Sequence, residues 1–220
     1  MPSPGTRGAG RVTAVLSDFD GTITKLDVAE LLLQRFAGEA WRGIEARHAE
    51  LGTRETLRRE FELVRVTRDQ ILSAAERLGE VDPTFPAFVQ FCRQNEVALE
   101  IVSEGFDVYL EHLLRRWGLD VPFRTNHAEW DGDRIVITHP YADPTCTLCG
   151  TCKMGRVLEM RAAGHRVAYV GNGVSDICPA LEADLVFAKD DLAALCREHG
   201  REHVTFRDFA DVQRGLASWR

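Results

Sequence analysis

The sequence predicts an α/β protein with a doubly wound parallel sheet as its core and a small all-helical cap domain inserted after the first strand. Three observations predict this architecture. Short apolar runs alternate with amphipathic helical stretches along most of the chain. The stretch from Lys25 to Asp82 has helical patterns but no strand pattern. With 220 residues, of which 45% are apolar, the chain can bury a core of this size.

Four short apolar runs predict the parallel strands, at residues 12–17, 97–103, 166–171 and 183–188. A helical pattern follows each of the last three, as crossover connections between parallel strands require. We therefore expect an α/β core from residues 11–24 and 83–220. The first ten residues, rich in Pro, Gly and Ser, are expected to form a disordered tail.

Residues 25–82 are expected to form the helical cap. Its segment 26–36 has an apolar face at helical spacing, and 67–79 opens with a capping-box pattern. A cap inserted directly after the first strand would lie over the carboxyl end of the sheet, where such folds bind ligands. Residues 121–152 depart from the alternation, with a predicted β-hairpin turning at "DGD" and then a cysteine-rich loop.

Composition and charge exclude several classes of partner. The 27 basic and 34 acidic residues give a net charge of −7, which disfavours a nucleic-acid partner. No apolar run approaches the roughly 18 residues needed to cross a membrane, and the first residues lack the apolar segment of a secretory signal. We expect a soluble cytoplasmic protein that acts on a small molecule; the sequence does not indicate its oligomeric state.

Polar residues gather at the ends of the predicted elements. Asp18 and Asp20 follow the first strand, Ser103 ends the second, Lys153 opens a helix, and Asp176 follows the third strand. Carboxylates hold Mg²⁺ through oxygen, a lysine neutralises a phosphate, and hydroxyl groups donate hydrogen bonds to its oxygens. The set as a whole is typical of phosphoryl transfer.

Four motifs, "DFDGTIT", "IVSEG", "CK" and "GNGVSD", resemble in order those of the haloacid dehalogenase superfamily of aspartate-nucleophile phosphatases, subfamily IB, whose core is Rossmann-like. Within it, "TNHAEWDGDRIVI", "CTLCGTCK" and "GNGVSDICPA" look most similar to phosphatases of methionine salvage. The last two also resemble phosphoethanolamine/phosphocholine phosphatases, and phosphoserine phosphatases are more distant. The resemblance implies hydrolysis of a small phosphorylated metabolite with Mg²⁺, because a closed cap leaves little room for a macromolecule.

The resemblance also implies a role for each site residue. Asp18 would attack phosphorus to form an aspartyl-phosphate, and Asp20 would act as general acid and then general base. The other expected roles are Mg²⁺ binding by Asp18, Asp20, Asn172 and Asp176, charge stabilisation by Lys153, and substrate contacts by Thr22, Ser103, Glu104 and Gly105.

Two positions leave alternatives open. Asp27 stands where phosphoserine phosphatases carry a glutamate that engages the substrate amino group, but it could equally be a charge at a helix N-terminus. Asn172 stands where the resembled family has an aspartate. A rival hypothesis is therefore a phosphometabolite-binding module without turnover. Thr22 also has an alternative role, since it could cap a local turn. The arginines at positions 54, 58 and 59 are expected on a solvated helix face, unless one of them reaches the substrate.

Three of the six cysteines, Cys146, Cys149 and Cys152, have the spacing of thiolate metal ligands. His139 or His127 could complete a structural zinc site. The alternative is that the three remain free thiols.

Overall fold

The computed structural model describes residues 13–219, so the predicted N-terminal tail lies outside the described residues. Its centre is a seven-stranded sheet in the order β4-β3-β2-β1-β5-β6-β7. The pairings are parallel except for β3 with β4. The strands are β1 (Thr13–Ser17), β2 (Ala98–Phe106), β3 (Phe123–Asp131), β4 (Arg134–Thr138), β5 (Arg166–Gly171), β6 (Leu185–Ala188) and β7 (Val204–Thr205).

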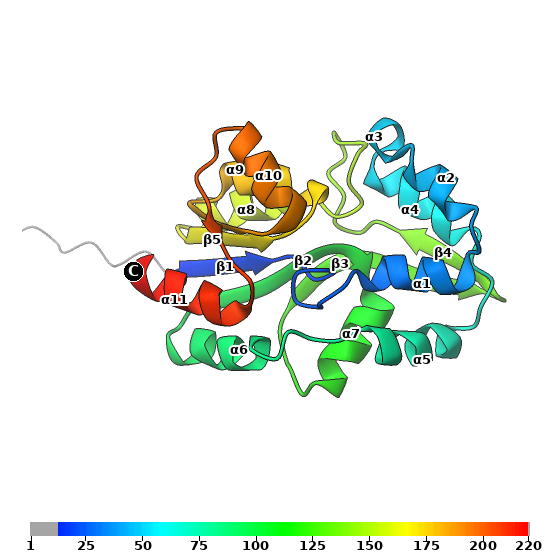
Figure 1. The fold of residues 1–220 in the computed structure, drawn as a ribbon, viewed down its shortest axis with the longest axis horizontal. Helices are drawn as coiled ribbons and strands as arrows, with labels where there is room; N and C mark the ends of the chain where they lie inside the picture. The colour runs from blue at the N-terminus through cyan, green and yellow to red at the C-terminus, as the bar shows by residue number, and fades with distance from the viewer. Residues whose placement is uncertain (1–12, 220) are drawn as a thin grey trace, which may run out of the picture.

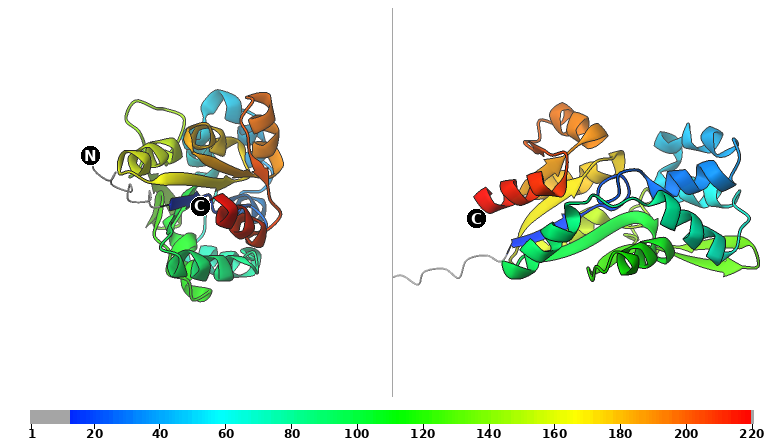
Figure 2. Two further views of the ribbon diagram at one scale, coloured as in Figure 1. Left: turned by 90° about the vertical axis from the view of Figure 1, so that its left-hand side faces the viewer. Right: turned by 60° about the horizontal axis from the view of Figure 1, so that its bottom comes forward.

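Helices cover both faces of this sheet (Figures 1 and 2). One face carries α6 (Phe85–Gln94), α7 (Asp107–Arg116) and α11 (Phe209–Trp219). The other carries α8 (Lys153–Ala162), α9 (Ile177–Glu182) and α10 (Asp190–Glu198), after the short 3₁₀ helix η1 (Val174–Asp176). The predicted doubly wound α/β fold is confirmed. No helix of the described residues is long and apolar enough to cross a membrane.

The central strand β1 is buried on both faces, because its residues alternate between two apolar clusters. Val15 packs with α6, α7 and α11, whereas Ala14 and Leu16 pack with α8, α9 and α10. The chain proceeds from β1 to β2 on one side and later returns to β5 on the other. The strand order therefore reverses between β1 and β5, and ligands of doubly wound sheets bind at such a switch point.

Apart from β2 and β6, which begin one and two residues later than predicted, the observed strands differ from the predicted ones at two places. The second strand continues to Phe106, so Ser103 lies inside β2 instead of at its end. The polar stretch 103–105 does not look like a strand in sequence, but it still lies along β3 with a shift of register between Val102 and Phe106. The short strand β7 and the helix α11 carry no prediction, and only two residues define β7.

The segment 25–82 is helical, with α1 (Val28–Phe36), α2 (Trp41–Glu45), α3 (His48–Leu51), α4 (Thr53–Phe61) and α5 (Arg68–Leu78). A Thr67 capping box opens α5. Figure 1 shows α5 beside α7, away from α2, α3 and α4. A 2.8 Å contact between His112 and Glu76 joins α7 to α5. The smaller group of α1 to α4 is therefore what stands over the carboxyl end of the sheet, and the domain boundaries stay a prediction.

Candidate active site

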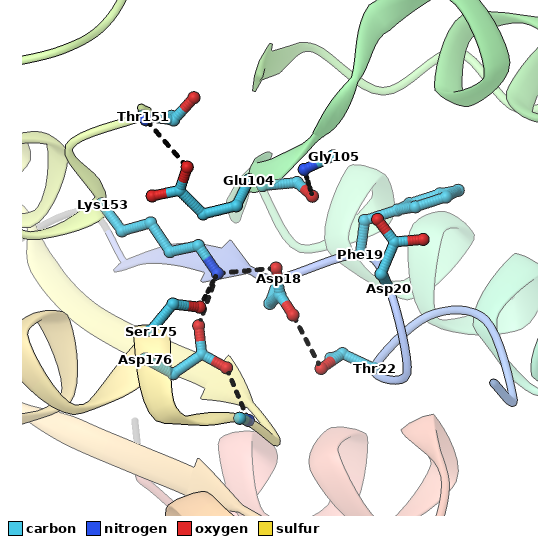
Figure 3. A network of polar contacts seen from close by, with 12 residues as sticks. Asp18, Phe19, Asp20, Thr22, Glu104, Gly105, Thr151, Lys153, Ser175 and Asp176 are labelled. Carbon is cyan, nitrogen blue, oxygen red and sulfur yellow. Dashed lines mark hydrogen bonds and ion pairs between the residues drawn. The ribbon is translucent and has the colours of Figure 1, made fainter. Parts of the chain in front are cut away.

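Asp18 follows β1 directly, and its backbone N–H donates to the Val170 carbonyl at 2.9 Å, which ties it to β5. The residue is 6% exposed. Lys153, the first residue of α8, donates from Nζ to Asp18 Oδ1 at 2.8 Å and to Asp176 Oδ1 at 2.7 Å (Figure 3). The same ammonium lies 3.1 Å from Ser175 Oγ. One buried cation thus joins the ends of β1, α8 and the β5 loop.

The charges of this group are strongly coupled. Burial and the neighbouring charge of Asp176 raise the pKa of Asp18 to about 7, against the opposing effect of Lys153. Burial alone would lower the pKa of Lys153, but the carboxylates of Asp176 and Asp18 raise it above its ordinary value. Lys153 is therefore a permanent cation beside the carboxylate predicted to be the nucleophile.

Asp20 lies in a different environment from Asp18. Its Oδ2 accepts a 2.5 Å hydrogen bond from the Tyr109 hydroxyl, and its Oδ1 accepts from the Val28 N–H at 3.1 Å. Burial, followed by the charge of Asp27, raises the pKa of Asp20 well above its usual range, although the Tyr109 hydrogen bond opposes this shift. A carboxyl group whose pKa is raised in this way suits a general acid.

Gly105 makes room for this pair. A Cβ at position 105 would lie 2.1 Å from Tyr109 Oη and 2.5 Å from Asp20 Oδ2. The expected substrate contact of Gly105 is untested, but this crowding gives a sufficient physical reason for a glycine there.

We expect Tyr109→Phe to lower kcat about tenfold, in line with the loss of a hydrogen bond to a charged group. The hydroxyl lowers the pKa of Asp20, so its removal raises that pKa further and moves the limb of the pH profile that reports Asp20 as a base to higher pH. The pH dependence of kcat checks this. Tyr141→Phe, at an exposed tyrosine, should leave the profile unchanged, and an unchanged profile in Tyr109→Phe would show that Tyr109 does not act on Asp20.

Asp176 uses both carboxylate oxygens for protein donors. Oδ1 accepts from Lys153 Nζ and from the Tyr169 hydroxyl at 2.6 Å, and Oδ2 accepts from the Asn172 and Gly173 N–H groups at 2.9 and 3.0 Å. The residue has no exposed surface. These contacts position Lys153 and the 172–173 turn, and Mg²⁺ binding by Asp176 stays a prediction.

Oxygen atoms suited to Mg²⁺ converge on the other side of Asp18. We assign the Asn172 amide with its nitrogen toward Asp18 Oδ2 at 3.3 Å, the Asp20 carbonyl at 3.2 Å and Thr22 Oγ1 at 2.7 Å. A half-turn of this amide would present its oxygen beside the other two, which gives the all-oxygen donor set that Mg²⁺ prefers. Gly21, with φ of +70°, allows this approach, since a Cβ there would lie 2.5 Å from the outer atom of the Asn172 amide. The residues present therefore fit the ion.

Ser103 and Glu104 lie on β2 beside this group. Ser103 is fully buried, and its Oγ accepts from the Gly105 N–H at 3.0 Å, which leaves its own hydrogen for another acceptor. Glu104 Oε2 accepts from the N–H groups of Gly150 and Thr151 at 3.0 and 3.2 Å. Glu104 thereby fixes the loop that ends at Lys153 (Figure 3). Its Oε1 is buried without a hydrogen-bond partner, so it can still accept a bond from a ligand.

The cysteine-rich loop does not assemble the predicted zinc ligands. Within residues 13–219, no group of three or more His, Cys, Asp or Glu side chains could hold a metal ion. His139 Nδ1 lies 2.8 Å from Asn126 Oδ1, and Cys152 Sγ caps α8 by accepting from the Gly155 N–H. His127, the alternative ligand, contacts Asp107 and Glu129.

Arg54, on α4, connects the helical segment to the cysteine-rich loop. Its guanidinium donates to the carbonyls of Cys146 at 2.9 Å and Cys149 at 2.7 Å. Arg54 is therefore part of the contact between α4 and the loop, whereas Arg58 and Arg59 pair with Glu55 on α4. Asp27 caps α1, because its Oδ1 accepts from the Glu30 N–H at 2.8 Å. This hydrogen bond supports the interpretation of Asp27 as a helix cap. The charge of Asp27 also raises the pKa of Asp20.

Sequence reasoning missed two tyrosines of the site, Tyr109 and Tyr169. Both are fully buried and lie on apolar faces of α7 and β5, where an aromatic residue is read as core. Their hydroxyl groups reach Asp20 and Asp176, respectively. A buried tyrosine needs a hydrogen-bond partner, and this was the only available signal.

Three comparisons place the chain among known proteins. The model of the family described as "Putative Phosphatase" matches residues 13–220. A 2-hydroxy-3-keto-5-methylthiopentenyl-1-phosphate phosphatase of Brevibacillus brevis is 34% identical over 90% of this chain and 92% of its own. One of the same name from Bacillus velezensis is 29% identical over 94% and 90%. The structure titled "Phospho-Aspartyl Intermediate Analogue of Phosphoserine phosphatase" has a TM-score of 0.73 at 18% identity, covering 93% and 98% of the two chains.

The fold and these similarities define a haloacid dehalogenase-type phosphatase, an enzyme of the class that the sequence motifs resemble. The chain belongs to the "Putative Phosphatase" family. These relatives favour an enzyme over the binding module that Asn172 raised as a rival hypothesis.

Proposed function

We propose that the chain hydrolyses 2-hydroxy-3-keto-5-methylthiopentenyl-1-phosphate, in methionine salvage, through an aspartyl-phosphate on Asp18. The observation that carries the mechanism is the contrast between two neighbouring carboxyl groups. Burial raises the pKa of both, but an ammonium 2.8 Å from Asp18 opposes the rise there, whereas the charge of Asp27 adds to the rise at Asp20. Environments that separate two carboxyl groups in this way assign one as the nucleophile and the other as the acid.

In the first half-reaction, an oxygen of Asp18 bonds to phosphorus while the bond from phosphorus to the leaving oxygen breaks, and Asp20 gives that oxygen its proton. In the second, Asp20 takes a proton from water, the water oxygen bonds to phosphorus, and the bond to Asp18 breaks. Phosphate and free Asp18 result. Lys153 neutralises charge that develops on the phosphoryl oxygens, and the Ser103 hydroxyl is free to donate to one of them.

Mg²⁺ would be held by Asp18, the Asp20 carbonyl and Asn172. When bound, it supplies positive charge next to the transferred phosphoryl group. Asp176 would hold Asn172 and Lys153 in position, because it accepts hydrogen bonds from the N–H of Asn172 and the ammonium of Lys153.

The names of the relatives support the substrate, and one observation supports a second candidate, a phosphorylated amine such as phosphoserine, phosphoethanolamine or phosphocholine. Burial, and then the charges of Glu45, Asp27 and Glu30, raise the pKa of Glu60 to about 8. Burial and the charges of Glu30 and Glu45 also raise the pKa of Asp27. A substrate ammonium would neutralise this acidic group. The methionine-salvage substrate has no such charge.

The test is turnover of the purified protein on both classes of substrate, with and without Mg²⁺. The proposal expects the highest kcat/KM on the methylthiopentenyl phosphate, and only with Mg²⁺. A higher kcat/KM on a phosphorylated amine would favour the second candidate. Absence of turnover on every substrate would contradict both.

Asn172 gives the sharpest prediction for the metal. An amide oxygen lacks the charge of a carboxylate, so we expect Asn172→Asp to tighten Mg²⁺ binding about tenfold, or about 1.4 kcal/mol. The wild-type protein should be active but require more Mg²⁺ than the variant. Activity against Mg²⁺ concentration measures this, with Asn95→Asp as a control that adds the same charge at the end of α6. Coinciding curves for wild type and Asn172→Asp would mean that residue 172 does not bind the metal.

A further inference from the structure

A cavity of about 360 Å³ lies beside the nucleophile, on the far side of Thr22 from the Lys153 group. It is lined by the segment after β1, the turn before α6, Lys189 after β6 and the loop between β7 and α11. Three cationic side chains and three threonines contribute to its wall: Lys25, Lys189, Arg207, Thr22, Thr24 and Thr84. Nothing in the proposed mechanism uses this cavity.

Two carboxylates, Asp82 and Asp208, also line the cavity, and protein donors already bind both of them. Asp208 Oδ1 accepts from the Asp211 N–H at 3.0 Å. Asp82 accepts from the N–H and hydroxyl of Thr84 at 2.8 and 2.7 Å and from the Phe209 N–H at 2.9 Å. The Thr24 hydroxyl donates to the Leu26 carbonyl at 2.8 Å, and Thr22 is engaged with Asp18 and Asn172. The three cations outnumber the two carboxylates of the wall, and their N–H groups are donors, which favours an anionic acceptor as the ligand.

Lys189 is the cation without a carboxylate partner. Lys25 pairs with Glu80 and Arg207 with Asp211, but among the described residues no carboxylate lies within ion-pair distance of Lys189 Nζ. Its ammonium lies instead 5.2 Å from the centre of the Phe206 ring. Burial lowers the pKa of Lys189, more than the surrounding carboxylates raise it. A half-buried cation in this state gains from an anionic ligand.

The backbone beside Lys189 is also strained. Asp190 has φ of +48°, a left-handed conformation that residues other than glycine adopt rarely. Lys189 follows β6 directly, and its own N–H donates to the Gly171 carbonyl at 3.3 Å. The strained turn thus fixes Lys189 beside the end of β5 at the cavity wall.

We propose that this cavity binds a tetrahedral oxyanion, inorganic phosphate or sulfate, through Lys189, with Lys25 and Arg207 at its rim. Because Thr22 is shared with the Asp18 site, an anion bound here lies next to the reacting centre. Phosphate, the product of the reaction, then inhibits partly without competing with the substrate. The binding itself does not depend on the proposed substrate or mechanism.

A titration of the ¹⁵N-labelled full chain with sodium phosphate, at ionic strength held constant with sodium chloride, tests this by NMR. The amides of Thr84 and Arg207 report on the cavity, and those of Ser103 and Gly105 report on the predicted phosphate site. We expect two separate binding curves. Lys189→Gln should weaken the cavity curve at least about tenfold and leave the other in place, whereas Lys189→Arg should keep both.

A sulfate titration separates the two oxyanions, since binding of both indicates a general oxyanion site and binding of phosphate alone a product site. Either result supports the proposal. It is overturned if the Thr84 and Arg207 amides follow the Ser103 curve, if Lys189→Gln leaves the cavity curve unchanged, or if chloride alone reproduces it. The last outcome would mean an adventitious ion only.

Discussion

Asp18→Asn is expected to lower turnover by a factor on the order of 10⁴ or more while the protein stays folded. The amide keeps the shape of the carboxylate, and its oxygen can still accept from Lys153 Nζ, which donates at 2.8 Å in the wild type. What is lost is the nucleophile, because an amide oxygen does not form a stable bond to phosphorus under these conditions.

The measurement is kcat on the best substrate, with the melting temperature as a check on folding. Asp69→Asn, on the first turn of α5, is the matched control and should retain wild-type kcat. Turnover at wild-type rate by Asp18→Asn, with contaminating phosphatases excluded, would refute covalent catalysis by this residue.

Lys153→Ala is expected to affect both activity and stability. The residue is 3% exposed and its ammonium lies between Asp18 and Asp176, so its removal leaves two buried carboxylates without their cation. We expect a loss of unfolding free energy of about 3–5 kcal/mol. Turnover should fall by roughly 10² to 10³, more than substrate affinity does, if the lysine mainly stabilises the transition state.

The double variant Lys153→Ala/Asp176→Asn separates these two effects. It removes one of the two buried carboxylate charges that the loss of Lys153 leaves without a cation. We therefore expect it to recover part of the unfolding free energy without recovering turnover. Chemical denaturation and steady-state kinetics on the same preparations measure both quantities. An unchanged kcat with a raised KM in the single variant would mean that Lys153 only anchors the phosphate.

The sheet core was predictable from the sequence because its strands are short apolar runs bounded by polar residues. The predicted strand 166–171 has the same bounds as β5, and β1 ends at Ser17 as predicted. Lys153 was predicted at a helix start and is the first residue of α8. Local patterns were sufficient here, because apolar periodicity and the ends of elements are encoded by neighbouring residues.

The separate roles of the site residues could not be predicted from local sequence patterns. Asp176 appears in sequence as one more carboxylate, and only the positions of Tyr169, Lys153 and two N–H groups show that its oxygens are occupied. Tyr109 reaches Asp20 across 89 positions of the chain. Contacts of this kind depend on how distant elements pack, which the pattern along a single chain does not specify.

The central claim, covalent catalysis by Asp18, is tested most directly by trapping the intermediate. The protein is quenched during turnover with Mg²⁺ and substrate, reduced with borohydride and examined by peptide mass spectrometry. An aspartyl-phosphate is reduced to homoserine, so the account predicts homoserine at position 18 alone, and only when substrate was present. Homoserine at another aspartate, or none at position 18 in a protein that is turning over, would contradict it.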